Sequence, residues 1–126
     1  MSTQPQPTVT LDTEDFGPIT LPEPSWCRGH ADHRPDAFRS DVTHYSAETV
    51  LAYQGSELFR VMVTESPYAT RPEHRRVCAY LEQGDYTGDF TPAGLYDLAA
   101  TLDAHADRLR DYADQLARIL GRGEGR

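Results

Sequence analysis

Hydrophobic and polar residues alternate along three segments in the middle of the chain, which is the pattern of half-buried β-strands. The alternation is clearest in ELFRVMVTE, residues 57–65, and in RRVCAYLEQ, residues 75–83. A third segment, ETVLAYQ at residues 48–54, follows the same pattern. Each segment has one apolar face and one mixed face, so we expect an antiparallel sheet that is covered on one side. The proline-containing stretch SPYATRPEHR predicts a long hairpin loop between two of the strands.

The C-terminal third of the chain changes to a helical period. Thr91 is a suitable N-cap, Pro92 suits the first helical position, and Gly121 suits the C-terminal end. Between Pro92 and Gly121, two sets of residues each recur every seven positions, as on the contact face of an amphipathic helix. They are Leu95, Leu102, Leu109 and Leu116 in one set and Leu98, His105, Tyr112 and Ile119 in the other.

This predicted helix is longer than the predicted strands. About 29 residues at 1.5 Å each span roughly 43 Å, whereas a strand of about eight or nine residues covers only about 28 Å. The C-terminal turns therefore need another cover, and a second copy of the helix, giving a homodimer, or a helix of a different protein would supply it. The expected interaction surface consists of Leu109, Tyr112, Leu116, Ile119 and Leu120.

These elements predict an α+β fold. We expect a small three- or four-stranded antiparallel sheet with one long C-terminal helix packed on one face, forming a single domain over residues 24–121. Residues 1–23 contain several prolines and few large apolar side chains, so we expect a flexible N-terminal arm. Residues 122–126, rich in glycine, are expected to form a flexible tail.

Composition and charge exclude several classes of protein. The chain has 126 residues and a net charge of −8, which argues against nucleic acid or an anionic membrane as the main partner. No apolar run approaches the roughly 18 to 20 residues that a membrane span needs. The N-terminal residues lack the basic and apolar parts of a signal peptide. We therefore expect a cytoplasmic protein with reduced cysteines.

The segment EPSWCRGHADH, residues 23–33, concentrates residues that can carry chemistry. Cys27 and His30 have a spacing that lets a thiolate and an imidazole chelate one ion around a tight turn. His33 and His44 could complete the ligand set, and zinc is the ion that suits these donors in a reducing compartment. The alternative is structural: Trp26 anchors the loop in the core, Cys27 packs as a small hydrophobic residue, and the histidines are scaffolding.

A catalytic interpretation has less support. Cys27 and His44 could form a thiol–imidazole pair. No nucleophile elbow, glycine-rich oxyanion motif or phosphate loop accompanies them. We therefore expect a non-enzymatic protein and keep a thiol-dependent enzyme as the last alternative.

Five motifs together resemble a family of small uncharacterised actinobacterial proteins, a domain of unknown function. They are PSWCRGH, DVTHYSAE, LFRVMVTES, RRVCAYLEQ and FTPAGLYDLAATL, and they cover about residues 24–105. The resemblance supports the α+β fold and implies no known activity. It also implies a second cysteine just before the Pro-x-Trp stretch. At this position the present chain has Glu23 or its neighbour, which leaves one thiolate in the loop.

The sequence thus predicts a small accessory protein that binds a partner or self-associates through its C-terminal helix. The alternative is a zinc-stabilised binding module that uses the Trp-Cys-His loop. Metal analysis of the purified protein separates the two.

Overall fold

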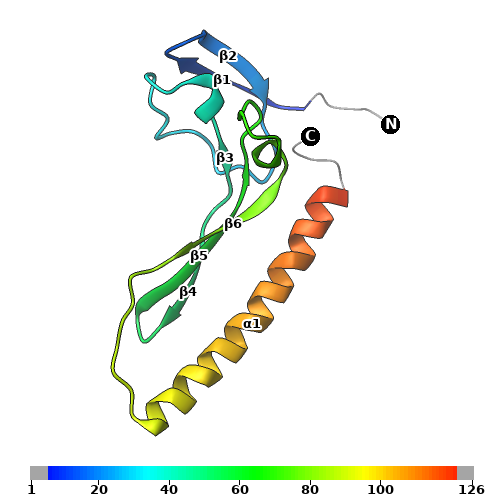
Figure 1. Cartoon of the computed structure of the whole chain (residues 1–126). Helices are drawn as coiled ribbons and strands as arrows, with labels where there is room; N and C mark the ends of the chain where they lie inside the picture. Colours follow the sequence, from blue (N-terminus) through cyan, green and yellow to red (C-terminus); the bar gives the residue numbers. More distant parts are fainter. Residues whose placement is uncertain (1–5, 122–126) are drawn as a thin grey trace.

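The computed structural model describes residues 6–121, and these form two antiparallel sheets and one long helix (Figure 1). Strands β1 (Thr8–Thr13) and β2 (Gly17–Pro22) form a two-stranded sheet. Strands β3 (His44–Tyr45), β4 (Thr49–Tyr53), β5 (Ser56–Glu65) and β6 (Cys78–Gln83) form the main sheet. Short 3₁₀ helices lie at Arg39–Asp41 (η1) and Pro72–Arg75 (η2), and α1 extends over Pro92–Gly121. The α+β fold expected from the sequence is confirmed.

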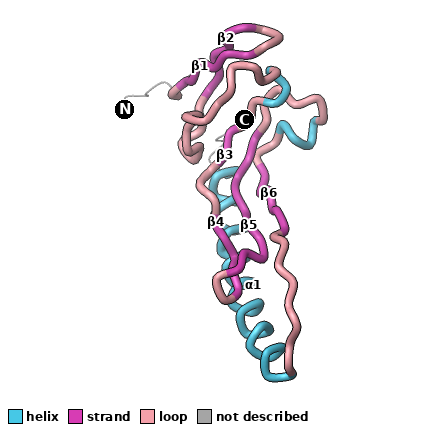
Figure 2. Tube along the Cα trace, turned by 90° about the vertical axis from the view of Figure 1, so that its left-hand side faces the viewer, coloured by secondary structure: helices cyan, strands magenta, loops and turns pink. Residues whose placement is uncertain are grey.

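Strand β5 is the centre of the main sheet. Thr64 pairs with Tyr45 of β3 and with Cys78 of β6, so these strands lie on opposite sides of β5. Strand β4 pairs with the first half of β5, on the same side as β3. The N–H of Ser46 donates to the Val63 carbonyl, and the N–H of Val63 donates to Ser46 Oγ. These two bonds continue the pairing along β5 between β3 and β4. Figure 2 shows β4, β5 and β6 side by side.

Strands β4 and β5, both expected from the alternating pattern, are joined by a tight hairpin turn. Tyr53 pairs with Ser56, which leaves a two-residue loop of Gln54 and Gly55. Both loop residues have positive φ, as a type I′ hairpin turn requires. The ladder is irregular between Leu51 and Ala52, one pair away from this turn.

Helix α1 begins where the sequence predicts, because Thr91 Oγ1 accepts a hydrogen bond from the N–H of Gly94. Figures 1 and 2 show α1 running along the main sheet, with its first turns extending beyond the β4–β5 hairpin. Two polar contacts join it to β4: Tyr53 donates to Asp97 at 2.9 Å, and His105 Nε2 donates to the Ala52 carbonyl at 2.7 Å. His105 is the buried residue of the helix, so the polar position in the contact face attaches it to the edge strand.

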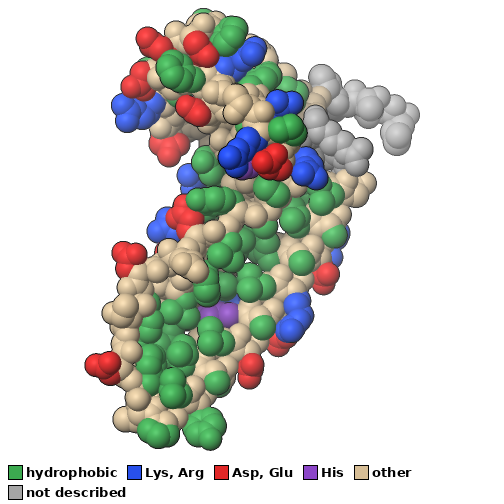
Figure 3. All heavy atoms as spheres, in the orientation of Figure 1, with side chains coloured by type: hydrophobic (Ala, Val, Ile, Leu, Met, Phe, Trp, Pro, Cys, Tyr) green, Lys and Arg blue, Asp and Glu red, His purple; other side chains and the backbone are tan. Residues whose placement is uncertain are grey.

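The contact between α1 and the sheet leaves apolar side chains open to solvent. Leu51 and Tyr53 of β4, the strand that α1 contacts, and Val61 of β5 are buried. In contrast, Leu81 of β6, on the same face as Val61, is 44 % exposed. A hollow of about 340 Å³ lies between the helix and strands β5 and β6, lined in part by Phe59. Figure 3 shows apolar side chains gathered along this boundary. Within residues 6–121, no helix combines the length and apolar character that crossing a bilayer needs.

The N-terminal hairpin differs from the expectation of a flexible arm over residues 1–23. Leu21 of β2 is 1 % exposed and packs with Leu11 of β1 and with Val42. The prolines that suggest disorder lie at the strand ends and edges, where a missing N–H costs no ladder bond. The hairpin therefore adds a second small core to the fold. Residues 1–5 of the expected arm and the expected tail at 122–126 lie outside the described residues.

Candidate metal centre

The loop after β2 brings chemistry from distant parts of the chain to one point. Glu23 directly follows β2, and its N–H donates to the Pro7 carbonyl, which extends the hairpin by one bond. The chain then turns, with Cys27 N–H bonded to the Pro24 carbonyl. Next, the N–H of Arg28 donates to the carbonyl of Tyr45 in β3 and so attaches the loop to the main sheet. Gly29 follows with φ of 96°, a conformation that L side chains rarely adopt.

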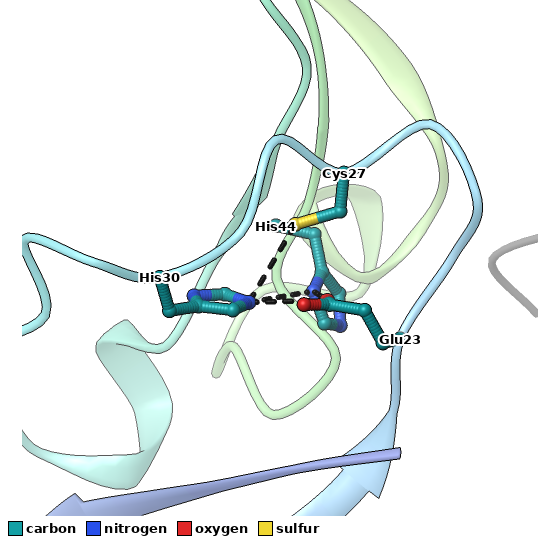
Figure 4. Close-up of side chains that lie close together, drawn as sticks. All are labelled: Glu23, Cys27, His30 and His44. Atoms are coloured by element: carbon teal, nitrogen blue, oxygen red, sulfur yellow. Dashed lines mark hydrogen bonds and ion pairs between the residues drawn. The ribbon is translucent and has the colours of Figure 1, made fainter. Parts of the chain in front are cut away.

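Four side chains converge where this loop meets β3 (Figure 4). Glu23, Cys27, His30 and His44 each offer one ligand atom, and all four atoms lie within 4.8 Å of one another. His30 Nε2 lies 3.6 Å from Cys27 Sγ, 3.3 Å from His44 Nδ1 and 3.1 Å from Glu23 Oε1. His44 Nδ1 lies 2.8 Å from the same carboxylate oxygen.

Two of these distances match those of a tetrahedral metal site. Bonds of about 2.0–2.3 Å to a zinc ion place ligand atoms about 3.3–3.6 Å apart. The separations of His30 Nε2 from His44 Nδ1 and from Cys27 Sγ already have these values. The contacts of Glu23 with the two imidazoles are shorter, as hydrogen bonds to a carboxylate are, and need to lengthen by only a few tenths of an ångström. A thiolate and a carboxylate together also balance the charge of a divalent ion.

The surroundings of the cluster support ligand chemistry as well. His44 is 1 % exposed and His30 is 9 % exposed in their side chains, so an ion held here would be screened from water. The N–H of Gly29 donates to Cys27 Sγ at 3.4 Å, and this hydrogen bond favours a thiolate. The His44 ring has a further hydrogen bond to the backbone of Pro22. Such outer bonds hold metal-ligating imidazoles in one orientation.

Protonation at the centre follows from burial. Burial raises the pKa of the Cys27 thiol, and although the Gly29 hydrogen bond opposes this, Glu23 adds to it. Burial likewise lowers the pKa of His44, with the charge of Glu23 opposing and His30 adding to the decrease. The imidazole is therefore held in the neutral form that binds metals, whereas the thiol must lose its proton to the ion.

The structure brings together Cys27, His30 and His44 from the predicted ligand set but not His33. The ring of His33 faces away to the hairpin, where Nε2 lies 2.8 Å from the carbonyl of Asp12. Glu23 occupies the fourth place instead. The sequence contained a signal for it, because Glu23 stands about where the resemblance implies a second cysteine.

Trp26 lies beside the cluster. Its side chain is only partly buried, whereas an anchor of the core would be fully buried. Its ring packs edge-on against His44, with 6.3 Å between the ring centroids. Trp26 is the single tryptophan of the chain. Its fluorescence therefore reports directly on the state of the centre.

Comparison with known proteins places these features in one family. The family described as "Domain of unknown function (DUF6907)" matches residues 8–118. The chain belongs to this family. The DUF6907 match includes the β1–β2 hairpin, the four converging side chains and nearly all of α1, so the hairpin is part of the family's domain. Neither the curated proteins nor the solved structures give a match to the chain.

The position of Glu23 predicts a variant that binds zinc more tightly than the wild type. Glu23→Cys should raise the zinc affinity of the protein at least about tenfold, because a thiolate is a softer and stronger zinc ligand than a carboxylate. Competition with a chromophoric chelator measures this change. Ser25→Cys, two positions away, is the matched control for an added thiol. Equal affinities of wild type and Glu23→Cys would mean that position 23 does not face the ion.

Proposed function

We propose that this chain is a non-enzymatic binding module whose Trp-Cys-His loop is held in place by a zinc ion. The observation that carries the proposal is the convergence of Glu23, Cys27, His30 and His44 within 4.8 Å. Four protein ligands complete a tetrahedral shell and leave no position for a substrate, which is typical of structural zinc sites. The single thiolate and the carboxylate make the set harder than the usual structural one, so zinc is bound less tightly than by four cysteines.

An ion at this centre would join parts of the fold that otherwise share little contact. Glu23 ends the hairpin, Cys27 and His30 belong to the loop, and His44 belongs to the main sheet. One ion bound to all of them would set the angle between the two sheets. The metal would then determine the shape of the surface that the hairpin and loop present to a partner.

The same geometry disfavours a thiol-dependent enzyme. Cys27 has an imidazole at hydrogen-bonding distance, that of His30, as a nucleophilic thiol requires. However, reactive thiols have a depressed pKa, and the pKa of Cys27 is raised by burial and by Glu23. A carboxylate inside the cluster suits a metal ligand better than a neighbour of a nucleophile.

The deciding experiment is elemental analysis of protein purified without a polyhistidine tag or a chelator. We expect about one zinc per chain and a higher melting temperature on reconstitution of the metal-free protein. Zinc affinity should fall as the pH decreases, because protons compete first for the Cys27 thiolate, whose pKa is raised, and at lower pH for the His44 imidazole, whose pKa is lowered. Zinc far below one equivalent, with no thermal shift when zinc is added, would exclude the proposal.

A second candidate function is self-association through α1. It rests on three leucines that recur every seven residues along the helix and remain open to solvent. Leu95, Leu102 and Leu109 are 54 %, 42 % and 38 % exposed. The interaction surface predicted from sequence lies further along and is partly covered, because Tyr112, Leu116 and Ile119 are half-buried while Leu109 and Leu120 are more exposed. A second helix would cover the open leucines in the same way that a coiled coil covers its seam.

Charged residues on this stripe should separate the copies. We expect the double variant Leu102→Glu and Leu109→Glu to be monomeric in light scattering at a concentration where the wild type is dimeric, because each glutamate places a charge in the contact. Circular dichroism should show an unchanged helix, since both positions are exposed. Gln115→Glu is the matched control on the exposed side of α1. A monomeric wild type at high micromolar concentration would exclude self-association.

A further inference from the structure

A separate cavity of about 260 Å³ lies where the hairpin and the β5–β6 connection approach β3. Its walls are mainly apolar: the rings of Pro22, Pro24 and Pro67 line it. Its polar lining includes Glu65 at the end of β5 and Arg75 at the end of η2. The ring of His44 also borders it. The chelating atoms of the candidate metal centre do not include Glu65, so this cavity is a second feature.

Glu65 is the unusual group in this cavity. The residue is 5 % exposed, and it pairs through its backbone with His44. Across the described part of the chain, its carboxylate has neither a hydrogen bond nor an ion pair. Its oxygen atoms are not among the fully enclosed side-chain atoms without a partner, so they border the open space of the cavity. A carboxylate that faces a cavity can instead be paired by a bound ligand.

Neighbouring charges do not provide this partner. Arg75 is exposed and uses its guanidinium to donate to the carbonyls of Ala69 at 2.6 Å and Thr70 at 3.2 Å. No ion pair joins Arg75 to Glu65 among residues 6–121. A divalent ion at the metal centre would already be balanced by Glu23 and the Cys27 thiolate. The carboxylate of Glu65 is thus left for a cation from outside.

We propose that this cavity binds a primary ammonium group on a short apolar stem. The ammonium would donate to Glu65, and the three proline rings would pack against the methylene groups. A water molecule takes up about 30 Å³ of liquid, so a cavity of this size has room for a stem of several heavy atoms. The chain contains no lysine, so an ammonium at the end of a methylene side chain must come from another molecule. A free alkylamine and the lysine side chain of a partner protein share this chemistry.

The test uses full-length protein at about pH 8, where an ordinary carboxyl is ionised, with zinc present in all samples. Isothermal titration and NMR shift mapping compare n-butylamine with n-butanol, its uncharged isostere. We expect the amine to bind at least about tenfold more tightly than the alcohol, because only the amine pairs the carboxylate. Glu65→Gln should remove this preference, whereas Glu73→Gln, an exposed carboxylate in η2, should keep it.

A second arm distinguishes the two sources of the ammonium. Nα-acetyl-lysine methylamide should bind as well as n-butylamine if the site receives a lysine of a partner, and more weakly if the site closes over a free amine. Equal binding of amine and alcohol by the wild type would overturn the proposal whether or not Glu65→Gln folds. An unchanged preference for the amine in folded Glu65→Gln would overturn it as well.

Discussion

Replacing His44 by alanine should reduce zinc affinity by at least about a hundredfold, whereas replacing His33 should leave the affinity unchanged. A structural zinc site contributes about 10 to 16 kcal/mol through four ligands, so one ligand is worth about 3 kcal/mol. His44 lies in a strand and is almost fully buried, so no other side chain can move into its place. The ring of His33 is instead directed to the carbonyl of Asp12.

Two measurements check this pair of variants. Chelator competition gives the affinities of both variants, and Trp26 fluorescence, which reports on His44 through the edge-on ring contact, gives the response of the wild type and of the His33 variant to added metal. Cys27→Ser should behave like His44→Ala. Equal losses in the His33 and His44 variants would contradict the ligand set and would point to a different arrangement of the loop.

Leu21→Ala should lower the free energy of unfolding by about 2–5 kcal/mol, or unfold the hairpin alone. Leu21 is 1 % exposed, and it packs with Leu11 and Val42 in the core beneath the hairpin. A two-stranded hairpin is marginal in water by itself, so β1 and β2 depend on this core and on the link through Glu23. Loss of the leucine leaves a cavity that the small core cannot fill.

Urea denaturation and amide hydrogen exchange distinguish these outcomes. If the hairpin unfolds alone, protection is lost over β1 and β2 and retained in β5. Thr20→Ala, at the neighbouring exposed position of β2, is the control and should cost well under about 1 kcal/mol beyond its surface hydrogen bond. Identical stability and exchange in the two variants would mean that residues 8–22 behave as the flexible arm expected from the sequence.

The main sheet and the helix could be predicted from the sequence because their signals are local. A two-residue period places alternate side chains on one face, and the register confirms this for Val61 opposite Leu81 and Val63 opposite Ala79. The start of α1 is likewise encoded by adjacent residues, Thr91 and Pro92. These features depend on backbone preferences and neighbours, not on distant contacts.

The hairpin could not be predicted in this way. The apolar side chains of residues 8–22 are too few to form a core alone, and the prolines weaken the strand pattern. Leu21 is buried because Val42, from a later part of the chain, packs against it. Burial of this kind depends on the contact between two segments that are distant in sequence. The pattern of hydrophobic and polar residues within one segment cannot predict such a contact.

At the candidate metal centre, the sequence by itself determined the donor atoms and the chelating pair, since Cys27 and His30 are joined by a turn that Gly29 permits. Only the tertiary structure decided which other side chains join them. His33 is closer in sequence but is drawn to the hairpin, whereas His44 is brought in by its strand pairing with Glu65. Glu23 completes the set because β2 ends beside β3. Ligands that lie in one turn are set by local geometry, and ligands on separate strands are set by the packing of the sheets that hold them.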